Sequence, residues 1–377
     1  MKAIGIIAEY NPFTNGHFYH LNTIKEKYPE HAIIVVLNGN FTQRGDVSIL
    51  DKWKRTEIAL KCGADLVIEL PFPFATQSAD FFAYGGVTIL EHLQAEKLIF
   101  GSESDSIEDL KEIANIQVNN EDLDHLVKVY SKLGSNYPTA LSNAIYDLTG
   151  KKINTPNDLL GISYIKTIIQ NNYSIIPESI QRTTNYHTSI ESASQIREQL
   201  KEGKDVNDYI PELELEYMNH FHFLEDYFDL LKYKILSEED LSIYQTVEEG
   251  IEHALKREIE TCNTIDELLE RIKSKRYTHN KLKRMLIHIL CNFTKEKAKQ
   301  MNQISYIRIL GFNDKGKEYL NKIKKEITIP IISKITREKD PMLEYEFNTT
   351  KIYDLPQKEN LIQKEYNKII DIGGKYD

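Results

Sequence analysis

The chain has 377 residues, of which 41% are hydrophobic and 28% charged, with a net charge of −10. This length predicts two domains, and this balance is typical of a globular protein that buries a full core. The sequence has no apolar run of the roughly 18 residues that cross a bilayer, and no secretion signal, so we expect a cytoplasmic protein that does not use a membrane. Its three cysteines are widely spaced and predict neither a disulfide framework nor a zinc site.

Short β-branched runs alternate with helical patterns over the first 200 residues. The apolar runs are Ala3–Ala8, Ile33–Leu37, Leu66–Leu70 and Lys97–Phe100, and helical patterns separate them at about residues 17–27, 51–62 and 79–93. Runs that are apolar on both faces are typical of parallel strands covered by helices on each side. We therefore predict an α/β fold with a doubly wound, Rossmann-like parallel sheet, and a fifth strand near Ser174–Gln181.

Helical patterns predominate after the fourth apolar run. Helical patterns fill residues 107–170, and one helix is expected to begin at Pro156, with Thr155 as its cap and Asp158 in its first turn. After about residue 200 long, charged helical patterns take over, with a small strand or hairpin at Ser305–Leu310 and Ile327–Ile332. We expect one α/β domain over residues 1–205 and a mostly α-helical domain over residues 206–377.

The most informative segment is Ile6–His20, IIAEYNPFTNGHFYH. A buried strand ends in a turn, after which Gly16 and His17 open a helix. Glycine lets a nucleotide approach the backbone closely, and the free amide groups and dipole of a helix start favour an anion. His17 can donate to phosphate oxygens, and ligands of open α/β sheets bind at the carboxyl ends of the strands. The pattern predicts a nucleotide site; the alternative is a plain strand–turn–helix junction with a surface histidine.

Seven segments resemble the bacterial tRNA(Met) cytidine acetate ligase family of the nucleotidyltransferase superfamily. They are Glu9–His17 (EYNPFTNGH), Asn38–Asp46 (NGNFTQRGD), Asp65–Pro71 (DLVIELP), Phe100–Glu103 (FGSE), Pro156–Lys166 (PNDLLGISYIK), Ser192–Arg197 (SASQIR) and Tyr306–Phe312 (YIRILGF). The resemblance extends over nearly the whole chain and goes well beyond one shared turn.

The resemblance implies an ATP-dependent ligase. Acetate and ATP would form acetyl-adenylate and diphosphate, and the acetyl group would pass to N4 of the wobble cytidine of elongator tRNA(Met), with release of AMP. Residues 1–205 would bind ATP and catalyse, and residues 206–377 would bind tRNA. Mg²⁺ would accompany ATP, although the sequence shows no dedicated metal cage. The sequence indicates no protein partner.

The resemblance also implies site residues, with His17 as the catalytic residue. The ATP-binding residues it implies are Ile7, Ala8, Glu9, Tyr10, Asn11, Pro12, Phe13, Thr14, Asn15, Gly16, His17, Phe18, Tyr19, His20, Gly101, Asn157 and Arg182. From the sequence alone, Gly101 could be a turn glycine, Asn157 a helix cap and Arg182 a solvated surface residue.

One position departs from the family pattern. The family turn usually reads His-Asn-Gly-His, whereas this chain has Thr14 in place of the first histidine. A threonine donates one hydrogen bond but carries no positive charge. The loss of one charge-assisted contact in the transition state costs about 1.5–3 kcal/mol, or roughly tenfold to hundredfold in rate.

Two further groups are candidates for phosphate or acetate. Ser192, Ser194 and Arg197 form a Ser-x-Ser-x-x-Arg stretch at a helix start, which related nucleotidyltransferases use for the β- and γ-phosphates; the alternative is an ordinary capped helix. Asn40 and Arg44 follow the second strand, beside the first loop of a doubly wound sheet. An arginine there could meet the acetate carboxylate or a phosphate.

Charge is unevenly distributed along the chain. Residues 201–270 hold 6 basic against 20 acidic residues, and residues 271–340 hold 19 against 6. Basic residues concentrated near one helix suit a tRNA backbone, and the alternative is a solvated helix face. The candidate tRNA-binding residues are Arg271, Lys273, Lys275, Arg276, Lys281, Lys283 and Arg284.

Two other functions are compatible with the sequence. An adenylyl- or cytidylyltransferase acting on a phosphorylated metabolite would use the same turn and fold, but would give no reason for the basic stretch. A weakly catalytic ATP- and tRNA-binding protein is the third possibility, and Thr14 is its only support.

Overall fold

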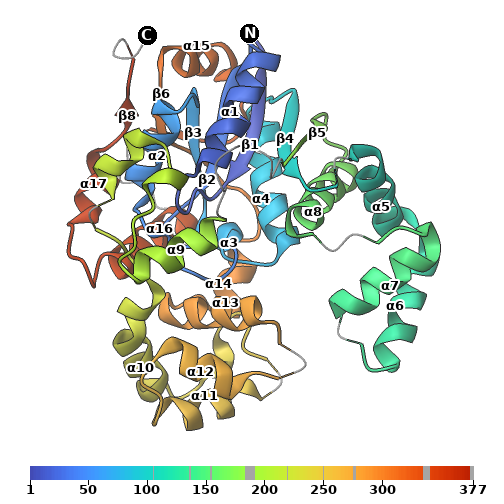
Figure 1. Ribbon diagram of the computed structural model, residues 1–377, viewed down its shortest axis with the longest axis vertical. Helices are drawn as coiled ribbons and strands as arrows, with labels where there is room; N and C mark the ends of the chain where they lie inside the picture. The colour runs from blue at the N-terminus through green and yellow to red at the C-terminus, as the bar shows by residue number, and fades with distance from the viewer. Residues whose placement is uncertain are drawn as a thin grey trace.

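The central sheet takes strands from both ends of the chain (Figure 1). The computed structural model describes residues 1–104, 106–135, 137–152, 155–182, 192–218, 220–248, 250–274, 277–333 and 340–373. The strands are β1 (Ala3–Ala8), β2 (Ala32–Asn38), β3 (Leu66–Leu70), β4 (Lys97–Ser102), β5 (Ile176–Gln181), β6 (Ile307–Phe312), β7 (Ile331–Ile332) and β8 (Ile370–Asp371). Their order is β5-β4-β1-β2-β3-β6-β7, and β8 pairs with β6.

The strand order confirms the predicted doubly wound α/β fold. The first five strands run parallel, and all five begin and end within two residues of the predicted limits. The chain moves from β1 through β2 to β3 on one side, and then adds β4 and β5 on the other. The carboxyl ends of β1 and β4 therefore lie where the direction of winding reverses, which is where open α/β sheets bind ligands.

Helices cover both faces of the sheet, which explains why its strands are apolar on both sides. Ile33, Val35 and Leu37 of β2 pack into one core with α1 (Asn15–Lys27) and α2 (Lys52–Lys61). Ile34 and Val36 point the other way, into a core with α4 (Ala79–His92) and α8 (Pro156–Asn171). Successive strand side chains point to opposite faces, so each strand contributes to both cores.

Five more helices lie in the described residues before position 205. They are α3 (Phe72–Ala75), α5 (Ile107–Asn119), α6 (Glu121–Lys132), α7 (Tyr137–Thr149) and α9 (Ala193–Lys201). Helices α6 and α7 pair with each other and stand away from the sheet in Figure 1. Helix α8 begins at Pro156 with Thr155 as N-cap, as the sequence predicts.

The second half of the chain is mostly helical, as expected, but it does not stay apart from the sheet. Its α-helices are α10 (Phe228–Ser237), α11 (Ile251–Ile259), α12 (Ile265–Ile272), α13 (His279–Leu290), α14 (Lys295–Gln300), α15 (Asp314–Ile323), α16 (Pro341–Tyr353) and α17 (Leu361–Asn367). Helices α10 to α13 lie together at the lower end of Figure 1. The strand expected at Ser305–Leu310 is β6, which lies antiparallel to β3, so the sheet of the first domain includes strands from beyond residue 205.

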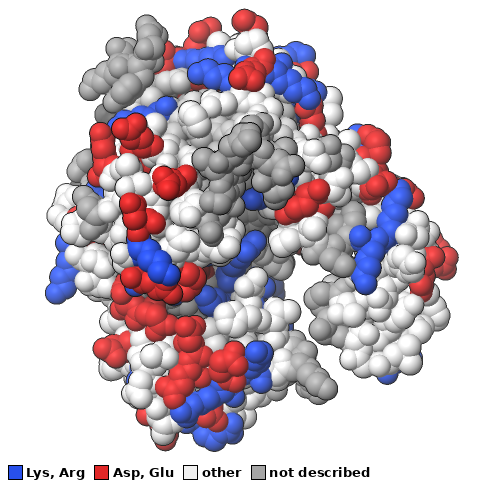
Figure 2. Space-filling view, in the orientation of Figure 1, with Lys and Arg blue, Asp and Glu red and all other residues white. Residues whose placement is uncertain are grey.

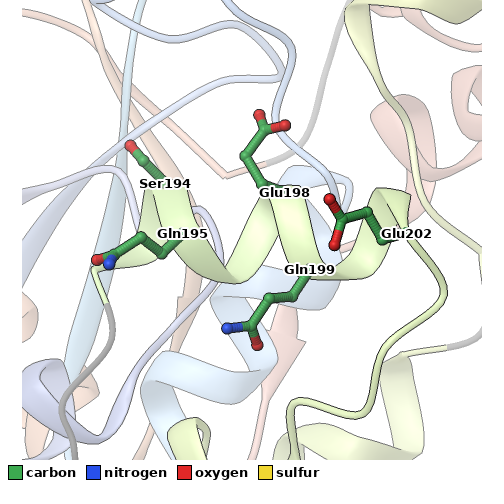
Figure 3. A pocket seen from close by; sticks show the side chains of 5 residues that line it. All are labelled: Ser194, Gln195, Glu198, Gln199 and Glu202. Atoms are coloured by element: carbon green, nitrogen blue, oxygen red, sulfur yellow. The ribbon is translucent and has the colours of Figure 1, made fainter.

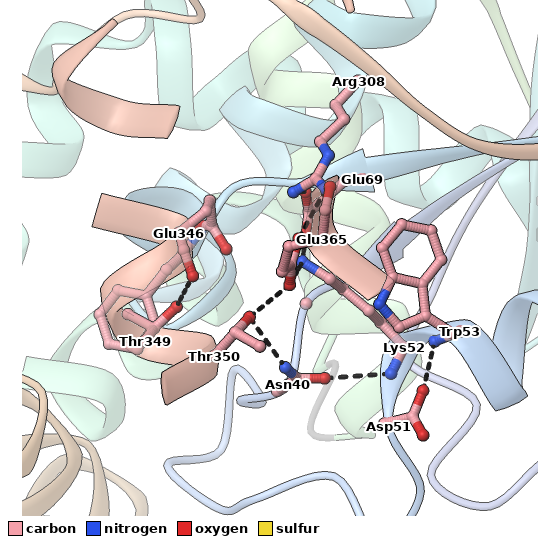
Figure 4. Close-up of polar contacts among 12 residues, drawn as sticks. Asn40, Asp51, Lys52, Trp53, Glu69, Arg308, Glu346, Thr349, Thr350 and Glu365 are labelled. Carbon is pink, nitrogen blue, oxygen red and sulfur yellow. Dashed lines mark hydrogen bonds and ion pairs between the residues drawn. The ribbon is translucent and has the colours of Figure 1, made fainter. Parts of the chain in front are cut away.

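A cluster of buried charges joins these returning elements to the sheet (Figure 4). Lys52 of α2 forms ion pairs with Glu69 of β3 and with Glu365 of α17, the latter at 2.8 Å. Arg308 of β6 pairs with the same two carboxylates, at 2.9 Å and 2.5 Å. All four residues are at most 3% exposed. Buried ions need partners of opposite charge, so the cluster fixes the C-terminal segment against α2 and β3.

Within the described parts of the chain, the helices are all too short or too polar to cross a membrane. Cys62, Cys262 and Cys291 are buried with free thiols.

Candidate active site

The turn after β1 is held by residues that are distant in sequence. The Asn11 side chain donates to the carbonyl of Val47 and accepts from the amide of Ile49, at 3.3 Å and 2.8 Å. Arg197 donates to the Asn11 carbonyl at 2.7 Å, and Glu214 accepts from the amide of Phe13 at 3.2 Å. The turn therefore keeps its shape before any ligand arrives.

Thr14, the departure from the family pattern, is the N-cap of α1. Its side chain accepts from the amide of His17, and its own amide donates to His17 Nδ1 at 3.0 Å. Because Nδ1 accepts a hydrogen bond, a neutral His17 carries its proton on Nε2. Burial, with a smaller contribution from Arg182, lowers the pKa of His17 to about 3. The imidazole is therefore neutral at pH 7 and keeps one N–H group to donate.

Aromatic side chains fix the ring of His17. The ring centroids of Tyr10 and Phe13 lie 5.0 Å and 5.6 Å from that of His17. Both aromatic rings are buried, with 2% and 0% of their surface exposed. Their side chains therefore pack beneath the histidine, so any contact they make with a nucleotide comes from the backbone.

The structure brings Gly101, Arg182 and His20 to the same end of the sheet. Gly101 lies in β4, and a Cβ atom there would lie 3.1 Å from Cγ of Arg182. Burial, followed by the charge of Arg182, lowers the pKa of His20 to about 4. His20 Nε2 is buried and has no hydrogen-bond partner among the described residues. Arg182 and His20 are thus close enough to His17 to lower its pKa, and Gly101 lies beside Arg182.

The loop after β4 is fixed by Asp158, whose role the sequence did not reveal. Its carboxylate accepts from Ser102 Oγ at 2.6 Å, and from the amides of Glu103 and Ser104 at 3.1 Å each. Burial alone would raise the pKa of Asp158, but these hydrogen bonds and one from Thr155 lower it. The signal read as a favourable charge in the first turn of α8 is therefore a link from that helix to β4. Asn157, a candidate ATP ligand, donates to Glu103 beside this loop.

Arg55 is a second residue that the sequence did not single out. It is fully buried in α2, and burial lowers its pKa to about 10. Its guanidinium donates to the carbonyls of Glu9, Asn38 and Gly39 and to the side chain of Asn38. It therefore ties the carboxyl end of β1 to that of β2. An arginine inside a charged helical pattern gives no local sign of this role.

The loop after β2 contacts the turn after β1 through Glu9. This turn, residues 9–17, is called the ATP turn below because the sequence predicts ATP binding there. Oε1 of Glu9 accepts from the amide of Gln43 at 2.7 Å, and burial raises the pKa of Glu9. Arg44 is exposed at the edge of this loop. Asn40, the other acetate candidate, is 4% exposed, and its side chain bonds to the amide of Lys52 and to Thr350. This geometry gives no support to an acetate contact for Asn40.

The Ser-x-Ser-x-x-Arg stretch lies beside the turn, but its serines have local partners. Ser192 caps α9 in a reciprocal pair with Gln195. Ser194 Oγ accepts from Arg197, whose other nitrogen reaches Asn11. Figure 3 shows the shallow pocket along α9, where Glu198 and Glu202 contribute carboxylates and Ser194 lies at one end. The negative charge of these carboxylates does not favour phosphate binding in the pocket. Arg197 instead contacts the turn after β1, through the carbonyl of Asn11.

The basic residues near α13 are mostly paired with acidic ones. Arg271 pairs with Glu267 and Glu258, and Lys273 pairs with Glu270 at 3.3 Å. Figure 2 shows blue and red side chains intermixed over the lower helices.

Further along, Lys281 pairs with Glu248 at 3.1 Å and Lys283 with Asp46 at 3.5 Å. Arg284 is partly buried and donates to the carbonyl of Gln43. The remaining two candidates, Lys275 and Arg276, lie outside the described residues. The acidic and basic halves of the charge pattern therefore partly neutralise each other in the fold.

Fold and site together define an α/β nucleotidyltransferase, with a helix start and a neutral histidine at the switch point of the sheet. The family model described as "HIGH Nucleotidyl Transferase" matches residues 1–368. The tRNA(Met) cytidine acetate ligases of Geobacillus sp. (strain WCH70) and Anoxybacillus flavithermus are each 39% identical to the chain, covering 97% of it and 98% of the relative. The chain belongs to the tRNA(Met) cytidine acetate ligase family.

Solved structures agree with this assignment. The crystal structure of Thermotoga maritima TmcAL bound with alpha-thio ATP has a TM-score of 0.90 and 29% identity, and the match covers 99% of this chain and 100% of that one. The apo form of the same protein has a TM-score of 0.89. The resemblance inferred from seven sequence segments is thus confirmed over the full length.

Proposed function

We propose that this chain activates acetate with ATP and transfers the acetyl group to N4 of the wobble cytidine of elongator tRNA(Met), in the cytoplasm. An acetate oxygen attacks the α-phosphorus of ATP, the bond to the β-phosphate oxygen breaks, and diphosphate leaves. The cytidine amine then attacks the acetyl carbon, loses a proton, and AMP leaves. The family membership and the ATP-analogue complex of the Thermotoga maritima relative support this proposal.

The single observation that carries the proposal is the state of His17. With Nδ1 occupied by the amide of Thr14, Nε2–H is the group free to donate from the helix start. A triphosphate beside the ring would raise the pKa of His17, since a nearby negative charge favours the protonated form. The ring can then stabilise the charge that builds up on the phosphates as diphosphate leaves.

We assign Arg182 to the same phosphates and Gly101 to the nucleoside. Arg182 is close enough to His17 and His20 to lower the pKa of both, so its positive charge lies near the start of α1. Gly101 lies under the stem of Arg182, where a larger residue would displace it. We assign acetate to Arg44, which is exposed to solvent. Arg44 is also close to Glu9, because its charge opposes the rise in the pKa of Glu9 that burial causes.

Mg²⁺ would accompany the triphosphate, although the site is not built to hold the metal alone. Over the described part of the chain, no group of three His, Cys, Asp or Glu side chains could hold a metal ion. The metal would therefore be bound by phosphate oxygens and water, as is usual for Mg²⁺ with nucleotides. We assign no step of the reaction to it.

We place tRNA binding on the helical region between residue 206 and β6. Lys273 and Lys281 keep 58% and 34% of their side-chain surface exposed there, although each has an acidic neighbour. Exposed pairs of this kind are weak in water, so a phosphate can replace the carboxylate. Catalysis would fall to residues 1–205 together with the strands that return to their sheet.

Mass spectrometry of nucleosides tests the function directly. Elongator tRNA(Met) incubated with the protein, ATP and labelled acetate should gain the mass of one acetyl group on cytidine. Omission of ATP or of acetate should abolish the gain. Nucleotidyl transfer to a phosphorylated metabolite without acetate would contradict the proposal.

A further inference from the structure

Helix α13 contacts the loop of residues 42–46, which follows β2. Gly45 of this loop has φ of 78°, and a Cβ atom there would lie 2.2 Å from the backbone nitrogen of Arg284. Contact between two backbones is possible here because residue 45 has no side chain. The loop and the helix therefore meet without a gap.

Polar contacts fix the same junction. Arg284 donates to the carbonyl of Gln43 at 3.1 Å, and Lys283 pairs with Asp46 at 3.5 Å. Among the described residues Arg284 has no acidic partner, and burial lowers its pKa to about 10. Burial of a cation whose partner is a neutral carbonyl costs free energy of folding. We therefore expect this contact to have a function.

Backbone hydrogen bonds close the loop on itself. The amide of Thr42 donates to the carbonyl of Asp46 at 2.9 Å, and the amide of Gly45 donates to the carbonyl of Thr42 at 3.1 Å. Its far side reaches the ATP turn, because the amide of Gln43 donates to Glu9 at 2.7 Å. Gln43 thus has Arg284 on its carbonyl and Glu9 on its amide.

We propose that Arg284 is a positioning residue for acetate activation: from α13 it holds the loop of residues 42–46, and the amide of Gln43 in turn holds Glu9 at the ATP turn. The sequence places Arg284 in a tRNA-binding face, whereas the structure turns it toward the catalytic loop. The proposal rests on the proposed function for its activity readout, but not for its structural readout.

Hydrogen exchange of the full-length protein tests the structural part without any substrate. In Arg284→Met the amides of residues 42–46 should exchange about tenfold faster, while those of β1 to β3 keep their rates. Unchanged exchange in residues 42–46 would overturn the proposal. A uniform increase across the sheet would also overturn it, since it would show a general loss of stability.

Acetate-dependent exchange of labelled diphosphate into ATP, without tRNA, tests the catalytic part. Arg284→Met should lower kcat/KM about tenfold, the effect of one charge-assisted hydrogen bond, with tRNA affinity within about twofold of the unaltered protein. Lys317→Met removes an exposed cation of α15, outside the region assigned to tRNA, and should change neither. Normal diphosphate exchange together with a tenfold loss of tRNA affinity would instead make Arg284 a tRNA contact.

A second variant approaches the contact from the loop. Gly45→Ala should separate the loop from α13 and lower diphosphate exchange at least as much as Arg284→Met, with faster hydrogen exchange again confined to residues 42–46. Full activity in Gly45→Ala would overturn the proposal. If the unaltered protein shows no acetate-dependent exchange, the proposed function fails, and the hydrogen-exchange result decides the positioning role by itself.

Discussion

The ATP turn and the surface of α12 and α13 both carry basic residues, but the fold treats them in opposite ways. At the turn, His17, His20 and Arg182 converge on the carboxyl ends of β1, β4 and β5, with no acidic partner among the described residues. On the helices, Lys273 and Lys281 each have a carboxylate within 3.3 Å. Tertiary structure thus decides which basic residues have an acidic partner, and the number of lysines and arginines in a segment does not show it.

His17→Ala is the sharpest test of the basic residues at the ATP turn. Loss of the Nε2–H donor should lower acetate-dependent diphosphate exchange about a thousandfold, within the usual range for a residue that assists charge or proton movement. The unfolding temperature should change little, since the ring only fills the edge of a packed turn. His253→Ala removes an exposed histidine of α11 and serves as control. Activity within tenfold of normal would remove His17 from the mechanism.

In the buried cluster of Lys52, Glu69, Arg308 and Glu365, by contrast, every charge has a partner of opposite sign. Lys52→Met leaves Glu69 and Glu365 with Arg308 alone, so we expect a loss of about 3–4 kcal/mol in the free energy of unfolding. Urea unfolding measures it, with the exposed Lys2→Met as a control that should change it by less than about 0.5 kcal/mol. A small effect of Lys52→Met would mean that Arg308 suffices for both carboxylates.

Glu346 adds a pH test to the same cluster. Burial and the neighbouring Glu69 raise its pKa to about 8. A carboxyl with a raised pKa keeps its proton in the folded state between the ordinary pKa of 4.5 and about 8, so stability falls as the pH rises through that window. Glu346→Gln should remove this dependence and stabilise the protein at pH 8, but hardly at pH 4.5. An equal effect at both pH values would contradict it.

The smallest expected effect concerns the paired lysines on the surface of α12 and α13. Lys273→Glu with Lys281→Glu should lower tRNA affinity about fivefold to tenfold at 0.15 M salt, because each replaces one exposed phosphate contact. The measured affinity should also become less dependent on salt. Lys315→Glu with Lys317→Glu, on α15 at the other end of the molecule, is the matched control. Equal losses in both pairs would place tRNA elsewhere.

Local sequence determined the first five strands, the start of α8 and the ATP turn. Each depends on neighbours within a few residues: a buried apolar run, a cap followed by proline, or a glycine at a helix start. The same local pattern carried the family resemblance, which the full-length comparisons confirm.

Contacts between distant residues were decided by tertiary structure alone. The sequence gives no local sign that β6 pairs with β3, that Arg55 joins two strand ends, or that Arg284 faces Gln43. Charge counted along the chain cannot show which carboxylate lies opposite which lysine, because pairing energy depends on distance and burial. Sequence thus predicted where a phosphate would bind, and the fold determined which charged residues are paired with one another.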